Sequence, residues 1–153
     1  MLRAGAGERG FSLLELLVVL LLIGLSSLIV LPSIGRGLRK RELRQSALKL
    51  AATARTLRSR AVYENTLQRL ILNPVENSYR IFRKKKVFLS SDLKITGIEG
   101  GEALGGGLKQ FLFFPNGSAL GGKIGISNHT GSASYTIGFD PLTGKVVVKR
   151  GRK

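Results

Sequence analysis

An apolar run near the N-terminus constrains this chain more than any other feature. It extends from Phe11 to Leu31, 21 residues with a single charge at Glu15, and it ends at Pro32. A helix of that length is roughly 30 Å long, about the hydrocarbon thickness of a bilayer. An ordinary signal peptide has a shorter apolar core, about 7–15 residues, followed by a small-residue cleavage pattern that is missing after Leu31. The run therefore predicts a membrane-spanning helix rather than an ordinary signal peptide.

Glu15 is the unusual residue of this run. A carboxylate inside a bilayer costs about 2.5–3.5 kcal/mol on insertion scales, so such a group needs a cationic partner or a functional reason. The alternative is a carboxylate that only lies in the interface region and extends its side chain to water. Glu15 is thus the first candidate functional residue.

The residues around the start of the run carry a resemblance. Gly10-Phe11-Ser12-Leu13-Leu14-Glu15-Leu16 resembles the processing and assembly motif of type IV pilins and type II secretion pseudopilins. The resemblance implies that a prepilin peptidase cuts between Gly10 and Phe11 and methylates the new N-terminus at Phe11. Glu15 then becomes the fifth mature residue, and Pro32 falls at mature position 22, where the family commonly has proline. The resemblance also implies that Glu15 pairs with the Phe11 amine of a neighbouring subunit during assembly.

Composition gives little support for catalysis. The chain has no cysteine, so it can form neither a disulfide nor a thiolate metal site. Its single histidine, His129, lies in an Asn-His-Thr-Gly stretch that reads as a turn, and only eight acidic residues follow Gly10. The glycine-rich segment 97–107 is not closed by the Gly-Lys-Ser/Thr of a phosphate-binding loop. We therefore expect no enzyme activity, no cofactor and no metal.

The charge is strongly basic and unevenly placed. The formal net charge is +16, which favours attraction to polyanions or to anionic lipid surfaces. Only Arg3 and Arg9 precede the apolar run, whereas five basic residues follow it closely, namely Arg36, Arg39, Lys40, Arg41 and Arg44. A simple count of positive charges would keep the C-terminal part in the cytoplasm. The resemblance implies the opposite orientation, which we expect because long domains translocate largely regardless of charge.

The remainder of the chain predicts a second helical stretch. Pro32, Gly35 and Gly37 disfavour helix, which predicts a kink or partial melting there. Residues 38–64 carry an apolar stripe at spacings of four and three that should dock onto a sheet: Leu43, Ala47, Leu50, Ala54, Leu57 and Ala61. Nine basic residues between Arg36 and Arg60, against the single acidic Glu42, read first as a solvated helix face.

Short strands and turns follow from Thr66. We predict strands at 67–72, 79–82, 87–89, 93–96, 122–126, 133–139 and 145–149, with a flexible loop at 97–107. Gln110–Ser118, with its Phe-Phe-Pro-Asn-Gly, is similar to the Phe-x-Pro-x-Gly stretch of the GspH/FimT branch of minor pseudopilins and pilins. The turn Asp140–Gly144 before a valine-rich final strand is also typical of that branch.

The predicted organisation has four parts. Residues 1–10 form a leader, 11–31 a transmembrane and assembly helix, 32–65 its kinked, basic, amphipathic continuation, and 66–153 a periplasmic β-rich head. The resemblance implies an α+β, pilin-like fold in which a long hydrophobic N-terminal helix packs on a small antiparallel β-sheet or β-sandwich domain.

The resemblance also implies the function. It indicates a minor pseudopilin in the bacterial inner membrane, with one membrane pass, that is processed by prepilin peptidase. Such a subunit joins the tip of a periplasmic type II secretion pseudopilus, or starts its assembly. The implied partners are the membrane, other pilin subunits, the peptidase and the inner-membrane assembly platform with its ATPase.

A minor type IV pilin that binds DNA for uptake is the alternative function. Some FimT-side members use a basic Gly-Arg-x-Arg stretch near the C-terminus, and this chain ends Lys149-Arg150-Gly151-Arg152-Lys153, without the second arginine. Lys149, Arg150, Arg152 and Lys153 are chemically able to contact phosphates. A basic terminus that contributes only solubility is the simpler reading of the same residues.

Overall fold

A computed structural model gives the fold of the chain. It describes residues 11–82 and 85–151, and within the helix the side chains of residues 28–36 and 38 also lie outside the described part. Contacts divide the chain into two compact units, an N-terminal unit that ends at Leu38 and a head unit, Arg39–Lys153. The two units are described separately below.

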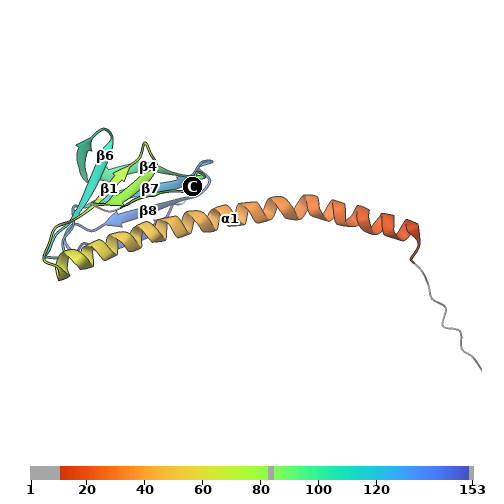
Figure 1. Cartoon of the computed structure of the whole chain (residues 1–153), viewed down its shortest axis with the longest axis horizontal. Coiled ribbons are helices and arrows are strands. Elements are labelled where there is room, and N and C mark those ends of the chain that lie inside the picture. The colour runs from red at the N-terminus through yellow and green to blue at the C-terminus, as the bar shows by residue number, and fades with distance from the viewer. Residues whose placement is uncertain (1–10, 83–84, 152–153) are drawn as a thin grey trace, which may run out of the picture. The chain divides into compact units, whose positions relative to one another are not determined.

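One helix, α1, extends from Leu13 to Tyr63 and contributes to both units (Figure 1). It spans 51 residues and is assigned without interruption through Pro32, Gly35 and Gly37. The two helical stretches expected from the sequence are therefore one continuous element. The partial melting expected near Pro32 is wrong, because the helical hydrogen-bond pattern continues through it, and the kink expected there stays a prediction.

The head-unit part of α1 packs through the predicted stripe. Leu43, Ala47, Leu50, Ala54, Leu57 and Ala61 are each at most 1% exposed, and Ala51 joins them. Spacings of three and four place these residues on one face of a helix with 3.6 residues per turn. Burial of each leucine contributes roughly 1.5–3 kcal/mol relative to exposure, so this face secures the helix to the sheets. The stripe prediction is confirmed.

Nine strands of the described chain form two antiparallel sheets (Figure 1). The five-stranded sheet A has the order β3 (Lys86–Phe88), β2 (Ser78–Ile81), β1 (Gln68–Asn73), β6 (Leu108–Phe113) and β5 (Glu102–Gly105). The four-stranded sheet B has the order β4 (Leu93–Gly100), β7 (Gly122–Asn128), β8 (Ser134–Phe139) and β9 (Val146–Arg150). Every strand pair in the two sheets is antiparallel.

Side chains from both sheets and from α1 form one hydrophobic core. Phe139 of sheet B contacts Phe111 and Phe113 of sheet A, with ring centroids 4.7 Å and 5.8 Å apart. Leu70 of β1 and Ile126 of β7 are fully buried in the same cluster. A helix packed on antiparallel sheets confirms the predicted α+β class.

The loop predicted at residues 97–107 is wrong. β4 continues to Gly100, and β5 occupies Glu102–Gly105. The glycines there mark a bulge and a close approach rather than flexibility: the register of β4 shifts between Ile95 and Gly97. A Cβ on Gly100, which has φ +70°, would lie 2.4 Å from the Gly121 carbonyl oxygen. Composition alone cannot distinguish this use of glycine from a flexible linker.

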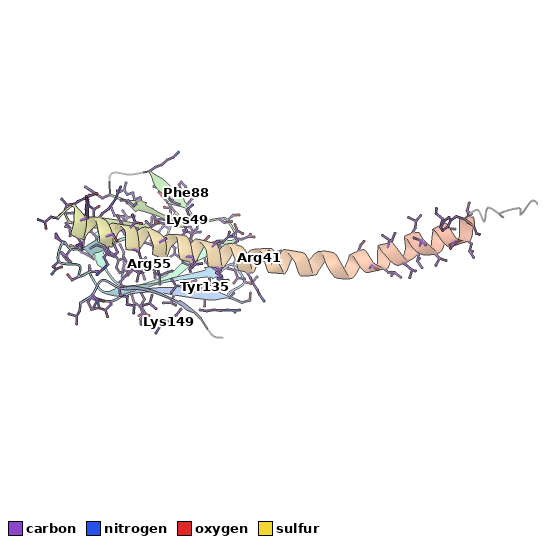
Figure 2. The ribbon with its side chains drawn as sticks, turned by 90° about the horizontal axis from the view of Figure 1, so that it is seen from below. Arg41, Lys49, Arg55, Phe88, Tyr135 and Lys149 are labelled. Atoms are coloured by element: carbon purple, nitrogen blue, oxygen red, sulfur yellow. The ribbon has the colours of Figure 1, made fainter. Side chains whose placement is uncertain are left out.

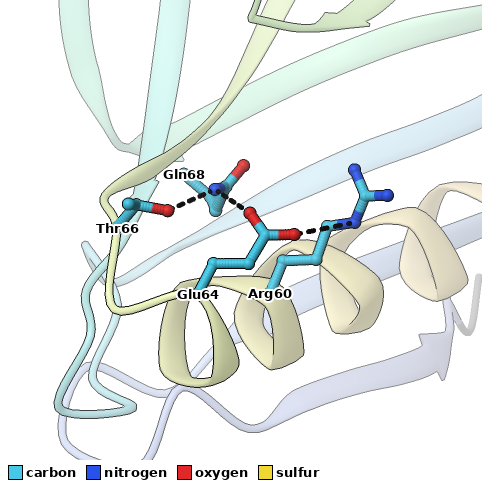
Figure 3. Close-up of polar contacts among 4 residues, drawn as sticks. All are labelled: Arg60, Glu64, Thr66 and Gln68. Carbon is cyan, nitrogen blue, oxygen red and sulfur yellow. Dashed lines mark hydrogen bonds and ion pairs between the residues drawn. The ribbon is translucent and has the colours of Figure 1, made fainter.

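A small polar group lies where α1 ends and the first strand begins (Figure 3). The Arg60 guanidinium lies 3.7 Å from the Glu64 carboxylate, and Gln68 donates to Glu64 at 3.4 Å and to the Thr66 hydroxyl at 3.0 Å. Asn65 adopts a left-handed φ of 49°, which asparagine tolerates better than most residues. These contacts direct the chain from the helix into β1.

Candidate functional site: the N-terminal segment and the head surface

The N-terminal segment presents only exposed side chains. All residues from 11 to 27 are exposed, and Phe11 and Leu13 keep about four-fifths of their surface accessible, 82% and 79%. Soluble monomers rarely expose contiguous apolar patches beyond a few hundred Å². An exposed apolar segment of this length indicates a surface that another apolar phase or molecule covers. Gly10 and the Pro32 side chain lie outside the described residues.

The hydroxyl groups of two serines in this segment donate hydrogen bonds to backbone carbonyls of the same helix. Ser26 donates to the Leu22 carbonyl at 2.8 Å, and Ser27 donates to the Ile23 carbonyl at 2.9 Å. A hydroxyl bonded within its own helix can enter an apolar environment without an unpaired donor. These serines, which interrupt the run in the sequence, are thus compatible with burial in lipid or among helices.

Glu15 lies in the first turn of α1. Within the part of the chain that the structure describes, no cation pairs with its carboxylate. Among the described residues, no helix combines the length and the hydropathy of a membrane span.

The two sequence motifs of the C-terminal third form one turn cluster. The turn at Pro115–Gly117 and the turn at Asp140–Gly144 are both held by Arg58 of α1, which donates through Nε to the Gly117 carbonyl at 3.1 Å and to the Thr143 carbonyl at 2.8 Å. The Ala119 amide also donates to the Pro141 carbonyl at 3.2 Å. The motifs therefore dock α1 on the sheets. Sequence reasoning missed Arg58, although its place directly after Leu57 of the stripe puts it on the flank of the buried face.

Asp140 organises its turn as a hydrogen-bond acceptor. Its Oδ1 accepts from the Thr143 amide at 2.8 Å, the Thr143 hydroxyl at 2.9 Å and the Leu142 amide at 3.1 Å. The hydrogen bond from the Thr143 amide, followed by that from the Thr143 hydroxyl, lowers the pKa of Asp140 below its ordinary value. The carboxylate thus serves turn geometry, not acid–base chemistry.

Two side chains, one from the turn between β1 and β2 and one from β6, occupy the free edge of β4. Asn77 donates its amide to the Leu93 carbonyl and accepts from the Ile95 amide at 3.0 Å, as a neighbouring strand would. Lys109 donates to the carbonyls of Ile98 at 3.1 Å and Gly100 at 3.3 Å. These contacts join the two sheets and satisfy an edge that would otherwise be open to a further strand.

The basic residues of the head unit lie mostly at the surface. Figure 2 shows Arg41, Lys49 and Arg55 along α1, with Tyr135 and Lys149 on one side and Phe88 on the other. The ion pairs found among the described residues are Arg60–Glu64, Lys86–Glu76 and Lys123–Glu99, and none involves a cation of α1 before Arg60. The exposure of Arg39, Lys40, Arg41, Arg44 and Lys49 agrees with the predicted solvated face, whereas Arg55 and Arg58 donate hydrogen bonds to carbonyls of the head. Of the tail, Lys149 and Arg150 are exposed, while Arg152 and Lys153 lie outside the described residues.

One hollow in the described part of the head unit lies over sheet B. A trough of about 490 Å³ over sheet B is lined partly by Gly100, Gly122 and Gly138, with Lys123 and Lys149 among its other residues. His129 is exposed in the turn after β7. Among the described residues, no group of three or more His, Cys, Asp or Glu side chains could hold a metal ion.

Comparisons with known proteins agree with these observations. Residues 6–31 match the family described as the prokaryotic N-terminal methylation motif. The type II secretion system protein H of Xanthomonas campestris pv. campestris is 27% identical over 143 residues, which cover 90% of this chain and 81% of that protein. The fold is similar to the minor pseudopilin EpsH from the type II secretion system of Vibrio cholerae, with a TM-score of 0.58 and 10% identity over 71% of this chain and 96% of that one.

The three findings cover different parts of the molecule. The motif match covers the N-terminal segment, the sequence relative covers nearly the whole chain, and the structural likeness establishes the pilin-like fold. Together they support a GspH-like minor pseudopilin.

Proposed function

We propose that this minor pseudopilin is cut between Gly10 and Phe11, is anchored in the bacterial inner membrane by the segment 11–31, and is assembled into the periplasmic pseudopilus of a type II secretion system. One observation carries the proposal: an exposed apolar helix with a single carboxylate, Glu15, continues into a helix that docks on a pilin-like head. The segment has no apolar partner among the described residues, so its partners are lipid before assembly and other subunits afterwards.

Four residues have assigned roles in this proposal. Gly10 and Phe11 form the cleavage junction, and the Phe11 amine is the methylation site. The Glu15 carboxylate pairs with the Phe11 amine of a neighbouring subunit, because two opposite charges in an apolar bundle attract strongly and either one alone is costly. Pro32 ends the apolar run and contributes to the packing of neighbouring helices in the fibre.

The role is structural. Pseudopilins assemble with other pseudopilins, and as a minor component this chain starts the fibre or caps its tip. We propose that it performs no chemistry of its own, and that the prepilin peptidase and the inner-membrane assembly platform act on it. No observation favours the alternative role in DNA uptake, and half of the basic tail on which that role depended, Arg152 and Lys153, lies outside the described residues.

Processing provides the direct test. The full chain is co-expressed with a prepilin peptidase, and the intact mass of the purified protein is measured. We expect the mass of a chain that begins at methylated Phe11, and the uncut precursor when a catalytically inactive peptidase is used. An uncut chain with the active enzyme, or a chain cut after Leu31, would contradict the proposal.

A further inference from the structure

Four cations lie close together where α1 enters the head unit. Arg39, Lys40, Arg41 and Arg44 are all exposed, and none of them takes part in an ion pair among the described residues. The only acidic residue in this stretch is Glu42. The cations are therefore available to a ligand outside the chain.

β9 brings a fifth cation to the same end of the head unit. Arg58 contacts the Thr143 carbonyl, and Arg55 donates through Nη2 to the Val146 carbonyl at 3.2 Å. The segment that leads into β9 therefore runs antiparallel to α1. Arg150 lies four residues beyond Val146, about 13 Å along an extended strand. The same distance corresponds to roughly nine residues of helix, which places Arg150 at about the level of Arg44 along the helix axis.

A tyrosine and the position of the C-terminal end also lie at this end of the head unit. Tyr135 of β8 pairs with Arg150, and Figure 1 shows the C-terminal end of the described chain at the end of the head unit where its helical segment begins. Tyrosine combines an apolar ring with a polar hydroxyl and is enriched where an apolar phase meets water. We call Arg39, Lys40, Arg41, Arg44 and Arg150 the neck cluster.

The short stretch of chain between them limits the distance from the neck cluster to the apolar segment. Arg39 follows Leu31 by eight residues, so their Cα atoms cannot be more than roughly 28 Å apart in any conformation. A continuous helix would separate them by about 12 Å. If the segment 11–31 spans the inner membrane, the cluster therefore lies within reach of the lipid headgroups at the end of that span.

We propose that the neck cluster binds the anionic headgroups of the membrane surface and holds the head unit against the bilayer before assembly. The inference rests on the proposed membrane anchoring of the segment 11–31. Clustered Lys and Arg directly beside a membrane segment are attracted to anionic lipid, and each such cation contributes roughly fivefold to binding. Withdrawal of the subunit into the fibre then exchanges headgroup phosphates for contacts with neighbouring subunits.

A single fluorescent label tests the docking. The chain has no cysteine, so Gln45→Cys introduces a unique attachment site beside the cluster for an environment-sensitive dye. The full chain is placed in nanodiscs of neutral phosphatidylcholine, or of the same lipid with about 30% phosphatidylglycerol. We expect a blue shift only in the anionic discs, and its loss at about 0.5 M salt through screening. A label at Tyr63→Cys, about 27 Å along the helix, should not respond.

Charge variants separate a defined surface from diffuse attraction. Arg41→Gln with Arg44→Gln should lower the ratio of docked to undocked protein about 25-fold, roughly fivefold for each cation. The matched control, Arg80→Gln with Lys85→Gln, removes the same charge from exposed positions on or beside β2 and β3 and should change the ratio less than twofold. Equal effects of the two pairs, or a response of the Tyr63 label, would overturn the proposal.

Flotation distinguishes failure of this inference from failure of the anchoring. If the full chain does not float with neutral vesicles at about 0.5 M salt, the proposed anchoring is wrong. If it floats but the Gln45 label ignores phosphatidylglycerol, the neck cluster does not bind lipid. Duplex DNA is the remaining alternative ligand. If DNA shifts the emission of the Gln45→Cys label in neutral discs at physiological salt, and the neck variants abolish that shift, the cluster is a nucleic-acid surface. That result would overturn the lipid proposal.

Discussion

Two glycines with almost the same backbone conformation test how tightly the turn cluster is packed. Gly144 has φ +61° and Gly131 has φ +65°, so alanine is strained at both positions. A Cβ on Gly144 would lie 2.3 Å from the Gly117 carbonyl oxygen and 2.8 Å from Nε of Arg58, whereas a Cβ on Gly131 would meet nothing within 4 Å. The pair thus separates backbone strain from a steric clash.

The expected free energies differ accordingly. The left-handed conformation costs roughly 1–2 kcal/mol for a residue with a Cβ, and this applies to both substitutions. Gly144→Ala adds overpacking, about 1–3 kcal/mol, because the turns at 115–117 and 140–144 must move apart. It also weakens the charged hydrogen bonds of Arg58, which are worth about 1.5–3 kcal/mol each. We expect Gly144→Ala to destabilise the head unit by at least about 2 kcal/mol more than Gly131→Ala.

Thermal unfolding of the full chain in detergent measures the difference. The β-sheet circular dichroism signal reports on the head unit, because the sheets lie entirely within it. About 1 kcal/mol shifts the melting temperature of a domain near this size by about 4 °C or more. Gly131→Ala should therefore lose several degrees, and Gly144→Ala about 8 °C more. Equal losses would show that the two turns relax freely and that Arg58 does not hold them together.

Three further changes test other contacts. Glu15→Gln keeps the shape but removes the charge, so we expect normal folding of the head and at least about tenfold less cross-linking to neighbouring subunits; equal incorporation would refute the pairing with Phe11. Because the hydrogen bonds lower the folded pKa of Asp140, its contribution to stability is present above about pH 4 and is lost as pH falls through the folded value. The melting temperature of Asp140→Asn should therefore fall less between pH 5 and pH 2 than that of the parent, and identical slopes would contradict the assignment. Asn77→Ala leaves the edge of β4 unpaired at the Leu93 carbonyl and the Ile95 amide, which should cost about 2 kcal/mol in denaturant unfolding; a loss under about 0.5 kcal/mol would mean that water replaces the side chain.

The sequence by itself determined the features that depend on spacing along one element. The apolar run from Phe11, the carboxylate at Glu15 and the buried face from Leu43 to Ala61 follow from helical periodicity, because a 3.6-residue repeat fixes which residues share a face. The α+β class and the resemblance to minor pseudopilins followed from a motif of fixed spacing at one end and a turn pattern at the other. These properties depend on residues close together in the sequence, so they can be predicted from the sequence alone.

Only the tertiary structure decided the contacts between residues far apart in the chain. Arg58 joins turns that lie 59 and 85 residues later, Asn77 and Lys109 pair with the edge of β4, and Arg55 reaches the Val146 carbonyl of β9. The strand assignment of residues 97–105 likewise depended on partners in β6 and β7, because glycine by itself disfavours a strand. Cations that the sequence distributes between a helix and a terminus become one surface only because antiparallel packing of β9 along α1 brings both to the same end of the head.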